Sequence, residues 1–245
     1  MCTLVVAWQV FSDAPLAVAA NRDEAFDRPS RPPSVWETEP AVVAPRDEAA
    51  GGTWIGYNAD GVFAAITNRW LDDPPLSERS RGRLLRDALG AETAEDACRL
   101  VERALDRRSY DGFNLVVADE RAAIYLTWDG SVTVEAFEPG VHVVVNVGAD
   151  GDYSIPAFRA DPARSQADSA ERLRAALQAE PGESAVAWID RAARTIADHE
   201  FGVCVHGEGF GTRSSSLILL GENPVYWFAD GPPCETTYER VEGQV

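Results

Sequence analysis

The second residue of the chain, Cys2, can become a terminal nucleophile. Initiator methionine is normally trimmed before a small side chain, and loss of Met1 would leave a thiol and a free α-amine on the same residue. Such an amine titrates near pH ~7.7–8.0, so it can take the thiol proton at neutral pH. The alternative is a cysteine that begins a buried strand, because cysteine is a common core residue.

Charged residues are expected beside this thiol. Residues 3–9 and 16–20 have the composition of two strands, with Pro15 in the turn between them. In an antiparallel pair, the start of the first strand neighbours the end of the second, which brings Arg22 and Asp23 next to Cys2. A guanidinium there would lower the pKa of the thiol and hold the thiolate. A carboxylate would orient the α-ammonium or shuttle its proton. The alternative is a charged strand end at the surface.

Three further polar residues lie at strand ends. Asn68 and Asn146 each follow an apolar run, and a side-chain amide in that place can donate to a developing oxyanion. Arg213 is flanked by small hydroxyl residues and could bind a carboxylate or steady the site. Ordinary turn residues and a surface arginine in a loop are the alternatives.

The order of the expected elements predicts an α+β fold. Strands are expected over residues 3–9, 16–20, 52–57, 62–67, 113–118, 122–128, 131–137, 141–147, 202–205, 214–220 and 225–228, and helices after Ser77 and Thr93 and over residues 166–179 and 184–198. Strand-rich and helix-rich blocks alternate in bulk, which favours antiparallel sheets covered by helices over a doubly wound parallel sheet. Residues 28–45 read as an irregular, proline-rich segment. No linker is evident, so we expect a single domain, residues 1–245.

Several motifs in fixed order resemble those of one family. They are Met-Cys-Thr-Leu at the start, Asn21-Arg22-Asp23-Glu24, Pro45-Arg46-Asp47, Gly51-Gly52-Thr53-Trp54-Ile55-Gly56, Thr67-Asn68 and Gly211-Thr212-Arg213-Ser214-Ser215. Together they resemble the NRDE family, also called the transport and Golgi organisation protein 2 family, over essentially the whole chain. That family is similar in pattern to the N-terminal nucleophile hydrolases near penicillin V acylase and bile-salt hydrolase. The resemblance implies a four-layer αββα sandwich of antiparallel sheets.

The same resemblance implies roles for individual residues. It implies that Cys2 is the nucleophile and that Arg22 and Asp23 lie beside it. It also implies that Asn146 is the oxyanion-hole asparagine, that Asn68 is a second polar group there, and that Arg213 is the site arginine. The sequence departs from the family's pattern after Asn146, which is followed by Val147 where a glycine is commoner.

Charge and hydropathy exclude some classes of function. The chain of 245 residues has 40 acidic and 22 basic residues, a net charge of −18, which repels nucleic-acid phosphates. The acidity is spread along the chain and predicts a halophilic, solvated surface adapted to high salt, with attraction of a cationic partner as the alternative. No apolar run approaches the ~20 residues of a transmembrane helix, and no secretory signal is evident. We therefore expect a cytoplasmic protein.

Cysteine and histidine spacing predicts no metal site. The four cysteines show no Cys-x-x-Cys spacing, so no disulfide framework is expected. Cys204 and His206 alone are too sparse for a metal, and three histidines leave the chain poor in zinc ligands.

Two functions fit these residues, and a third fits them poorly. The first is a cysteine N-terminal nucleophile hydrolase or acyltransferase that acts on a non-peptide C–N amide or related small acyl substrate through a thioacyl-enzyme and requires no cofactor. The alternative is a haem or acyl-lipid binding and trafficking protein on a hydrolase-like scaffold, in which Cys2 or a histidine would ligate the haem iron. A purely structural protein would not explain polar motifs at strand ends. We favour the hydrolase, and the sequence supports a placed thiol better than a freed amine.

Overall fold

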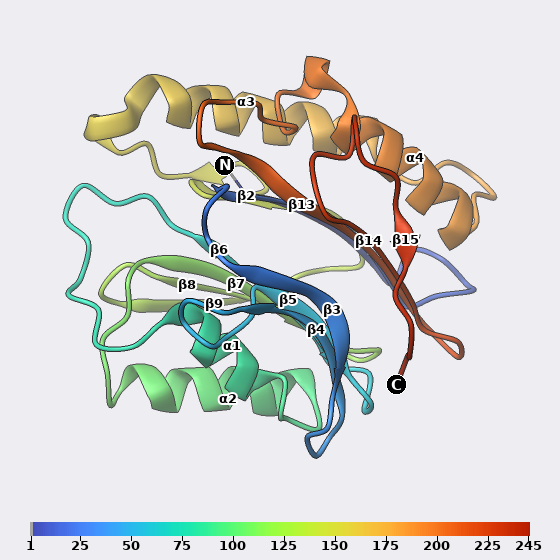
Figure 1. Ribbon diagram of the computed structural model, residues 1–245, viewed down its shortest axis with the longest axis horizontal. Coiled ribbons are helices and arrows are strands. Elements are labelled where there is room, and N and C mark those ends of the chain that lie inside the picture. Colours follow the sequence, from blue (N-terminus) through green and yellow to red (C-terminus); the bar gives the residue numbers. More distant parts are fainter. Residues whose placement is uncertain (1) are drawn as a thin grey trace. The chain divides into compact units, whose positions relative to one another are not determined.

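The computed structural model describes residues 2–245 and divides them into two compact units. Unit 1 contains the residues up to Arg28 and Pro139–Val241, and unit 2 contains Pro29–Glu138 and Glu242–Val245. Each unit holds one antiparallel sheet and one pair of α-helices (Figure 1). The α+β class with antiparallel sheets is therefore confirmed. Each unit is described separately below, and the single domain stays a prediction.

The sheet of unit 1 has eight strands in the order β12-β11-β10-β1-β2-β13-β14-β15. Their bounds are β1 Thr3–Trp8, β2 Leu16–Ala25, β10 Gly140–Val145, β11 Gly148–Ala149, β12 Asp152–Tyr153, β13 Phe210–Leu220, β14 Val225–Ala229 and β15 Glu239–Arg240. The expected hairpin of the first two strands is confirmed, since Thr3 pairs with Asn21 and Trp8 with Leu16. All six residues of β1 are buried between β10 and β2.

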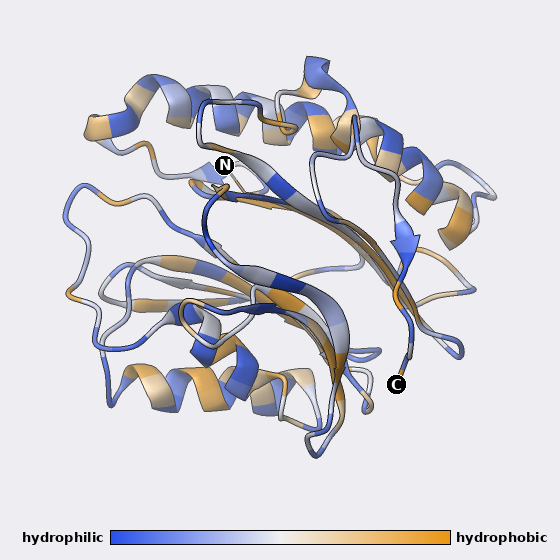
Figure 2. Ribbon diagram, viewed as in Figure 1, coloured by the Kyte–Doolittle hydropathy of each residue, from blue (hydrophilic) through white to orange (hydrophobic). Residues whose placement is uncertain are grey.

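Two helices cover one face of this sheet (Figure 1). Helix α3 (Ala160–Ala176) packs on β10, and α4 (Ala185–Ala197) packs on β2 and β13. Both helices carry apolar and polar residues on different sides (Figure 2), and their buried side chains include Leu173, Trp188 and Ile196. Short 3-10 turns precede α3 (η1, Ala157–Arg159) and follow α4 (η2, His199–Phe201). Among the described residues, no helix has the length and apolar character needed to cross a bilayer.

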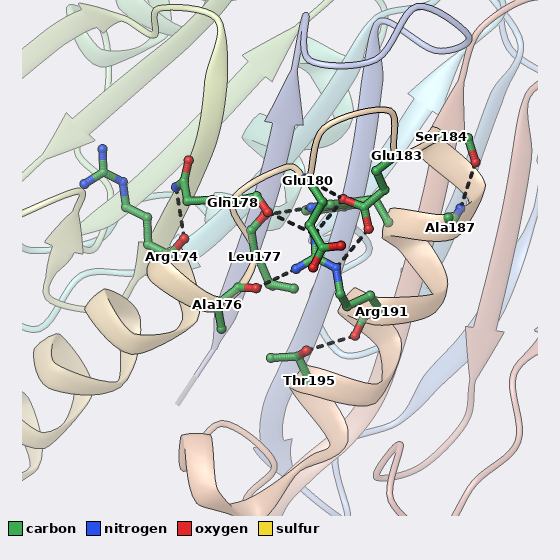
Figure 3. A network of polar contacts seen from close by, with 11 residues as sticks. Arg174, Ala176, Leu177, Gln178, Glu180, Glu183, Ser184, Ala187, Arg191 and Thr195 are labelled. Carbon is green, nitrogen blue, oxygen red and sulfur yellow. Dashed lines mark hydrogen bonds and ion pairs between the residues drawn. The ribbon is translucent and has the colours of Figure 1, made fainter.

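Arg191 on α4 locks the connection between α3 and α4 (Figure 3). Its guanidinium donates to both carboxylate oxygens of Glu183, over 2.9 and 2.6 Å. The same group donates to the carbonyls of Ala176 and Gln178, over 2.5 and 2.9 Å. Arg191 thereby satisfies carbonyls that the end of α3 and the following turn leave without helical partners. Its hydrogen bonds also lower the pKa of Glu183.

Arg191→Ala is expected to reduce the free energy of unfolding by about 2 kcal/mol at neutral pH, because it removes charge-assisted hydrogen bonds from a mostly buried pair. Arg191→Lys should reduce the free energy of unfolding by less than Arg191→Ala does, since it keeps a positive charge but an ammonium lacks the planar fork of the guanidinium. Glu183 has a folded-state pKa below its unfolded value of about 4.3. Its contribution to stability is therefore fully present above that unfolded value and is lost as pH falls through the folded pKa. Urea unfolding at neutral and acid pH checks this.

The exposed Arg194, on the same helix, gives the matched control, and Arg194→Ala should leave the urea midpoint nearly unchanged. A difference between wild type and Arg191→Ala that stays constant from about pH 7 to about pH 3 would contradict the ion pair as its source.

Unit 2 has a seven-stranded antiparallel sheet in simple chain order. Its elements are β3 Ser30–Trp36, β4 Val42–Asp47, β5 Ile55–Asn58, β6 Phe63–Asn68, α1 Arg81–Ala88, α2 Ala94–Leu105, β7 Phe113–Ala118, β8 Ala123–Trp128 and β9 Val132–Ala136. Helix α1 packs on β6 and α2 on β7 and β8. Thr93 caps α2 as expected, whereas the cap of α1 is Ser80 and not Ser77.

Two segments differ from the sequence-based expectation. Residues 28–45 were expected to be irregular but contain β3 and the start of β4. Pro32 and Pro33 fit because they lie where the register shifts between Arg31 and Ser34, on the edge strand of the sheet. Residues 202–205, expected as a strand, form a loop, and β13 begins earlier than expected, at Phe210.

The second glycine of the Gly51-Gly52-Thr53-Trp54 motif has a packing role in unit 2. A Cβ added to Gly52 would lie 2.2 Å from the carbonyl carbon of Gly82, in the first turn of α1. The amide of Thr53 donates to the Gly82 carbonyl over 3.0 Å. Only glycine permits this close approach of two backbones.

Candidate active site

Cys2 lies directly before β1, near the middle of the unit 1 sheet. Because Thr3 pairs with Val145 on one side and with Asn21 on the other, the next step along the sheet sets Cys2 beside Asn146 and Arg22. Three strand ends therefore bring the cysteine, the asparagine and the charged residues of β2 together within unit 1. The proposed removal of Met1 lies outside the described residues.

Two hydrogen bonds fix Cys2. Its backbone nitrogen donates to Oδ1 of Asn146 over 2.9 Å, and its Sγ donates to the backbone carbonyl of Asp23 at 3.6 Å. The side chain is partly buried. The nitrogen that would become the α-amine and the thiol of the same residue are thus held by two neighbouring strands.

Asn146 is itself held in place from helix α3. It is buried, and its Oδ1 also accepts a hydrogen bond from Nε2 of Gln166 over 3.0 Å. With Oδ1 accepting from both groups, Nδ2 is the donating end of the amide. Sequence reasoning missed Gln166, although a glutamine on the apolar face of an expected helix was the signal that could have found it.

Asp23 is held by Thr212, a second residue that sequence reasoning missed. Oγ1 of Thr212 donates to Oδ1 of Asp23 over 2.6 Å and accepts from the amide of Val205 over 2.8 Å. Burial raises the pKa of the Asp23 carboxyl. A carboxyl so placed takes up a proton more readily than an exposed aspartic acid.

Burial raises the pKa of the Cys2 thiol, and the Asp23 carboxylate adds to the increase. Arg22 acts in the opposite direction but with a smaller effect. The net direction is therefore opposite to the expected stabilisation of a thiolate by Arg22. At neutral pH the resting side chain is a thiol, and nucleophilic attack requires a base to remove its proton.

Arg22 is buried and contributes structure as well as charge. Its Nη2 pairs with Oε2 of Glu24 at 3.4 Å, and that carboxylate also contacts Arg28 at 3.6 Å. The first residue of the motif, Asn21, donates from Nδ2 to the carbonyls of Ile196 and Val203, both over 2.9 Å. Within the Asn21–Glu24 motif, Arg22 and Asp23 therefore lie near Cys2, whereas Asn21 anchors the end of α4.

Arg213 lies on β13, the strand paired with Arg22 and Asp23 of β2. One extra residue on β13 shifts the register between Thr212 and Ser214, and Arg213 occupies this bulge. Its Nη1 pairs with Oδ1 of Asp230 at 2.6 Å. No hydrogen bond joins Arg213 to Cys2 among residues 2–245.

Asn68 lies in unit 2, at the exposed end of β6. Its Oδ1 accepts a hydrogen bond from Nη2 of Arg81 over 2.8 Å. Of the six residues singled out from the sequence, the structure gathers Cys2, Arg22, Asp23 and Asn146 in unit 1, with Arg213 on the neighbouring strand β13, whereas Asn68 lies in unit 2. The catalytic roles of all six stay predictions.

Comparison with solved structures identifies the fold. The chain is similar to penicillin V acylase from Agrobacterium tumefaciens, with a TM-score of 0.58 and 14% identity over 94% of this chain and 83% of that one. It is similar to a mutant conjugated bile acid hydrolase from Clostridium perfringens, with a TM-score of 0.52 and 11% identity over 100% and 94% of the two chains. It is also similar to the Caenorhabditis elegans N-acylethanolamine-hydrolyzing acid amidase orthologue, with a TM-score of 0.56 and 11% identity over 90% and 94%. The expected N-terminal nucleophile hydrolase-like fold is confirmed.

Sequence comparison identifies the family. The human Transport and Golgi organization protein 2 homolog is 26% identical over 226 residues, which cover 84% of this chain and 82% of the relative. The corresponding Bos taurus protein is 26% identical over 247 residues, covering 86% and 89%. The model of the family described as Transport and Golgi organisation 2 matches residues 1–230. This chain belongs to the Transport and Golgi organisation 2 family.

Proposed function

We propose that this protein is a cysteine hydrolase whose nucleophile is Cys2 and whose substrate is a small, non-peptide amide or related acyl compound. The observation that carries the proposal is the placement of Cys2, with its nitrogen 2.9 Å from Asn146 and its thiol against the backbone of Asp23. Nucleophile, base and oxyanion donor are then supplied by neighbouring strand ends of one sheet.

Acylation follows from these positions once Met1 is removed. The Cys2 thiol attacks the carbonyl carbon of the substrate while its proton passes to the α-amine of the same residue. Nδ2 of Asn146 donates to the oxyanion of the tetrahedral intermediate. As the C–N bond breaks, the α-ammonium returns the proton to the leaving nitrogen, which leaves as an amine. A thioester between Cys2 and the acyl group remains.

Deacylation uses the same groups in reverse order. A water molecule attacks the thioester carbonyl and gives one proton to the α-amine. The C–S bond breaks, the thiolate recovers that proton and the carboxylic acid leaves. The Asp23 carboxyl, held by Thr212, orients the ammonium in both halves of the reaction.

The similar structures support this proposal by what their names state. They are an acylase for penicillin V, a hydrolase of conjugated bile acids and an amidase that hydrolyses N-acylethanolamines. The bile acid hydrolase was solved with the cysteine at its own position 2 replaced by alanine. These names favour an amide substrate with an organic acyl group.

The hydrolase is favoured over haem trafficking by the groups around the thiol. Once Met1 is removed, the nitrogen of Cys2 supplies a base beside the thiol, and Asn146, which contacts that nitrogen, supplies an oxyanion donor. Haem ligation by Cys2 would need neither group.

A removable N-terminal extension that ends directly before Cys2 tests the base. Hydrolysis of penicillin V, a conjugated bile acid and an N-acylethanolamine is measured before and after cleavage, with the Cys2→Ala chain treated identically as control. We expect turnover only after cleavage, rising with pH through about 7.7–8.0 as the α-amine loses its proton. Equal turnover before and after cleavage would reject the amine as base. A cleaved chain that hydrolyses none of these amides would contradict the hydrolase.

A further inference from the structure

Outside the candidate active site, four side chains of metal-ligating types meet in one place in unit 1. They are His199, Cys204, His206 and Cys234, referred to below as the His2Cys2 cluster, and their ligand atoms all lie within 4.8 Å of one another. The whole chain has only three histidines and four cysteines, so the cluster holds two of each. Such a concentration of scarce residue types is not explained by core packing, because both histidines are exposed.

Two of the three distances inside the cluster fall in the range between ligands of one tetrahedral ion, and the third is slightly shorter. Sγ of Cys204 lies 3.5 Å from Sγ of Cys234 and 3.7 Å from Nε2 of His206, and the latter nitrogen lies 3.1 Å from Cys234. Zinc bound at ~2.3 Å to sulfur and ~2.0–2.1 Å to nitrogen places its tetrahedral ligands ~3.3–3.8 Å apart. The fourth ligand, His199, is near, since its ring meets that of His206 edge-on with centroids 5.1 Å apart.

Three separate segments bring these side chains together. His199 begins the turn η2, which ends at Gly202 in the left-handed conformation with φ 71°. Cys204 and His206 follow in the loop before β13. Cys234 lies in the connection from β14 to β15, in a turn where the amide of Thr236 donates to the carbonyl of Pro232 over 2.9 Å. The backbones of the turns at His199 and Cys234 are thus held by contacts that do not involve the cluster's own side chains.

A carboxylate stands behind one of the histidines. Nε2 of His206 faces the sulfur of Cys234, while its Nδ1 lies 4.0 Å from Oε1 of Glu235. Metal-bound histidines commonly present the second ring nitrogen to a carboxylate, which fixes the tautomer and strengthens the ligand. At 4.0 Å the two groups form no hydrogen bond, but the carboxylate lies near the ring nitrogen that would face away from a metal bound to Nε2 of His206.

We propose that the His2Cys2 cluster is a structural binding site for Zn²⁺. Two thiolates and two imidazoles are a preferred ligand set for this ion, and four protein ligands close the coordination sphere. A closed site of this kind stabilises structure and leaves no position for a reacting water.

The site would clamp the loop that supports Asp23. The amide of Val205, between two of the ligands, donates to Thr212, and Thr212 donates to Asp23. The backbone amide of Thr212 also donates to the carbonyl of Val205 over 2.8 Å. Bound zinc would therefore fix one support of the candidate active site without taking part in catalysis.

Zinc content of the full chain tests this proposal without any measurement of activity. The protein is reduced, stripped with a chelator, loaded with Zn²⁺ and freed of excess ion, and its metal is counted by mass spectrometry. We expect one zinc per chain in the wild type and in the matched control Cys98→Ala, whose thiol lies on α2 of unit 2. We expect no stoichiometric zinc in Cys234→Ser or in His206→Gln. Glu235→Gln should bind zinc about tenfold more weakly.

Cobalt reports the ligands directly and guards against variants that misfold. Co²⁺ bound to the wild type should show the absorption of a tetrahedral ion and a thiolate charge-transfer band. With Co²⁺ in excess, so that a site lacking one ligand is also filled, that band should be weaker in Cys204→Ser than in His199→Gln, because only the former loses a thiolate. Circular dichroism identifies any variant that has failed to fold.

Three results would overturn the proposal. One is a reduced wild-type chain that takes up no zinc, and a second is zinc that remains bound to a folded Cys204→Ser, Cys234→Ser double variant. The third is a spectrum without thiolate bands. If the reduced chain takes up no zinc and the untreated chain is lighter by two hydrogen atoms with Cys204 and Cys234 joined, the pair is a disulfide and not a metal site.

Discussion

Cys2→Ala is expected to lower kcat by at least about 10³-fold on any amide that the wild-type chain hydrolyses, because no other group replaces the nucleophile. The side chain is partly buried and makes one weak hydrogen bond, so the fold should survive the substitution. Turnover is measured at matched concentrations, with thermal unfolding as a check of the fold. Cys98→Ala is the matched control, since it removes a different thiol and should leave kcat unchanged.

Cys2→Ser separates the two properties of the residue. It retains the α-amine but replaces the thiol by a less acidic, less nucleophilic hydroxyl, so kcat should fall well below wild type. Wild-type turnover by Cys2→Ala, with Met1 removed and the fold intact, would eliminate Cys2 as the nucleophile.

Asn146→Asp is expected to lower kcat by about 10²- to 10³-fold, the usual loss when one oxyanion donor is removed. The substitution is nearly isosteric. It keeps an oxygen to accept from Cys2 and Gln166 but removes the two N–H groups of Nδ2. If these donate only to the transition state, kcat should fall while KM changes little. Steady-state kinetics on the same amides measures both constants.

Gln166→Leu is the comparison that distinguishes donation from positioning. It removes the hydrogen bond that orients Asn146 but leaves the amide in place, so its effect on kcat should be smaller than that of Asn146→Asp. An Asn146→Asp chain with wild-type kcat would contradict the oxyanion role. Equal losses in both variants would assign Asn146 a structural role.

The arrangement around Cys2 was largely predictable from the sequence. Two apolar runs separated by a turn with Pro15 predict a hairpin, and the period of a strand then places Arg22 and Asp23 beside the first residues of the chain. Asn146 followed from the end of another apolar run. These inferences depend only on local pattern and short connections, which sequence carries well.

Other features depend on information that a local pattern lacks. The bulge at Arg213 is one inserted residue in a strand, and a local sequence pattern does not show such an insertion. The charges near Cys2 were visible in the sequence, but burial, which decides the net direction of its pKa, was not. The His2Cys2 cluster draws Cys234 from 30 residues beyond Cys204, so no spacing motif could reveal it.

Trapping of the acyl-enzyme tests the central claim most directly. The mature chain is mixed with penicillin V or an N-acylethanolamine, quenched in acid and examined by intact mass and peptide mapping. We predict a chain that lacks Met1 and carries one acyl group as a thioester on Cys2, which hydroxylamine removes and which Cys2→Ala lacks. An acyl group on another residue, or turnover by a chain that retains Met1, would contradict the account.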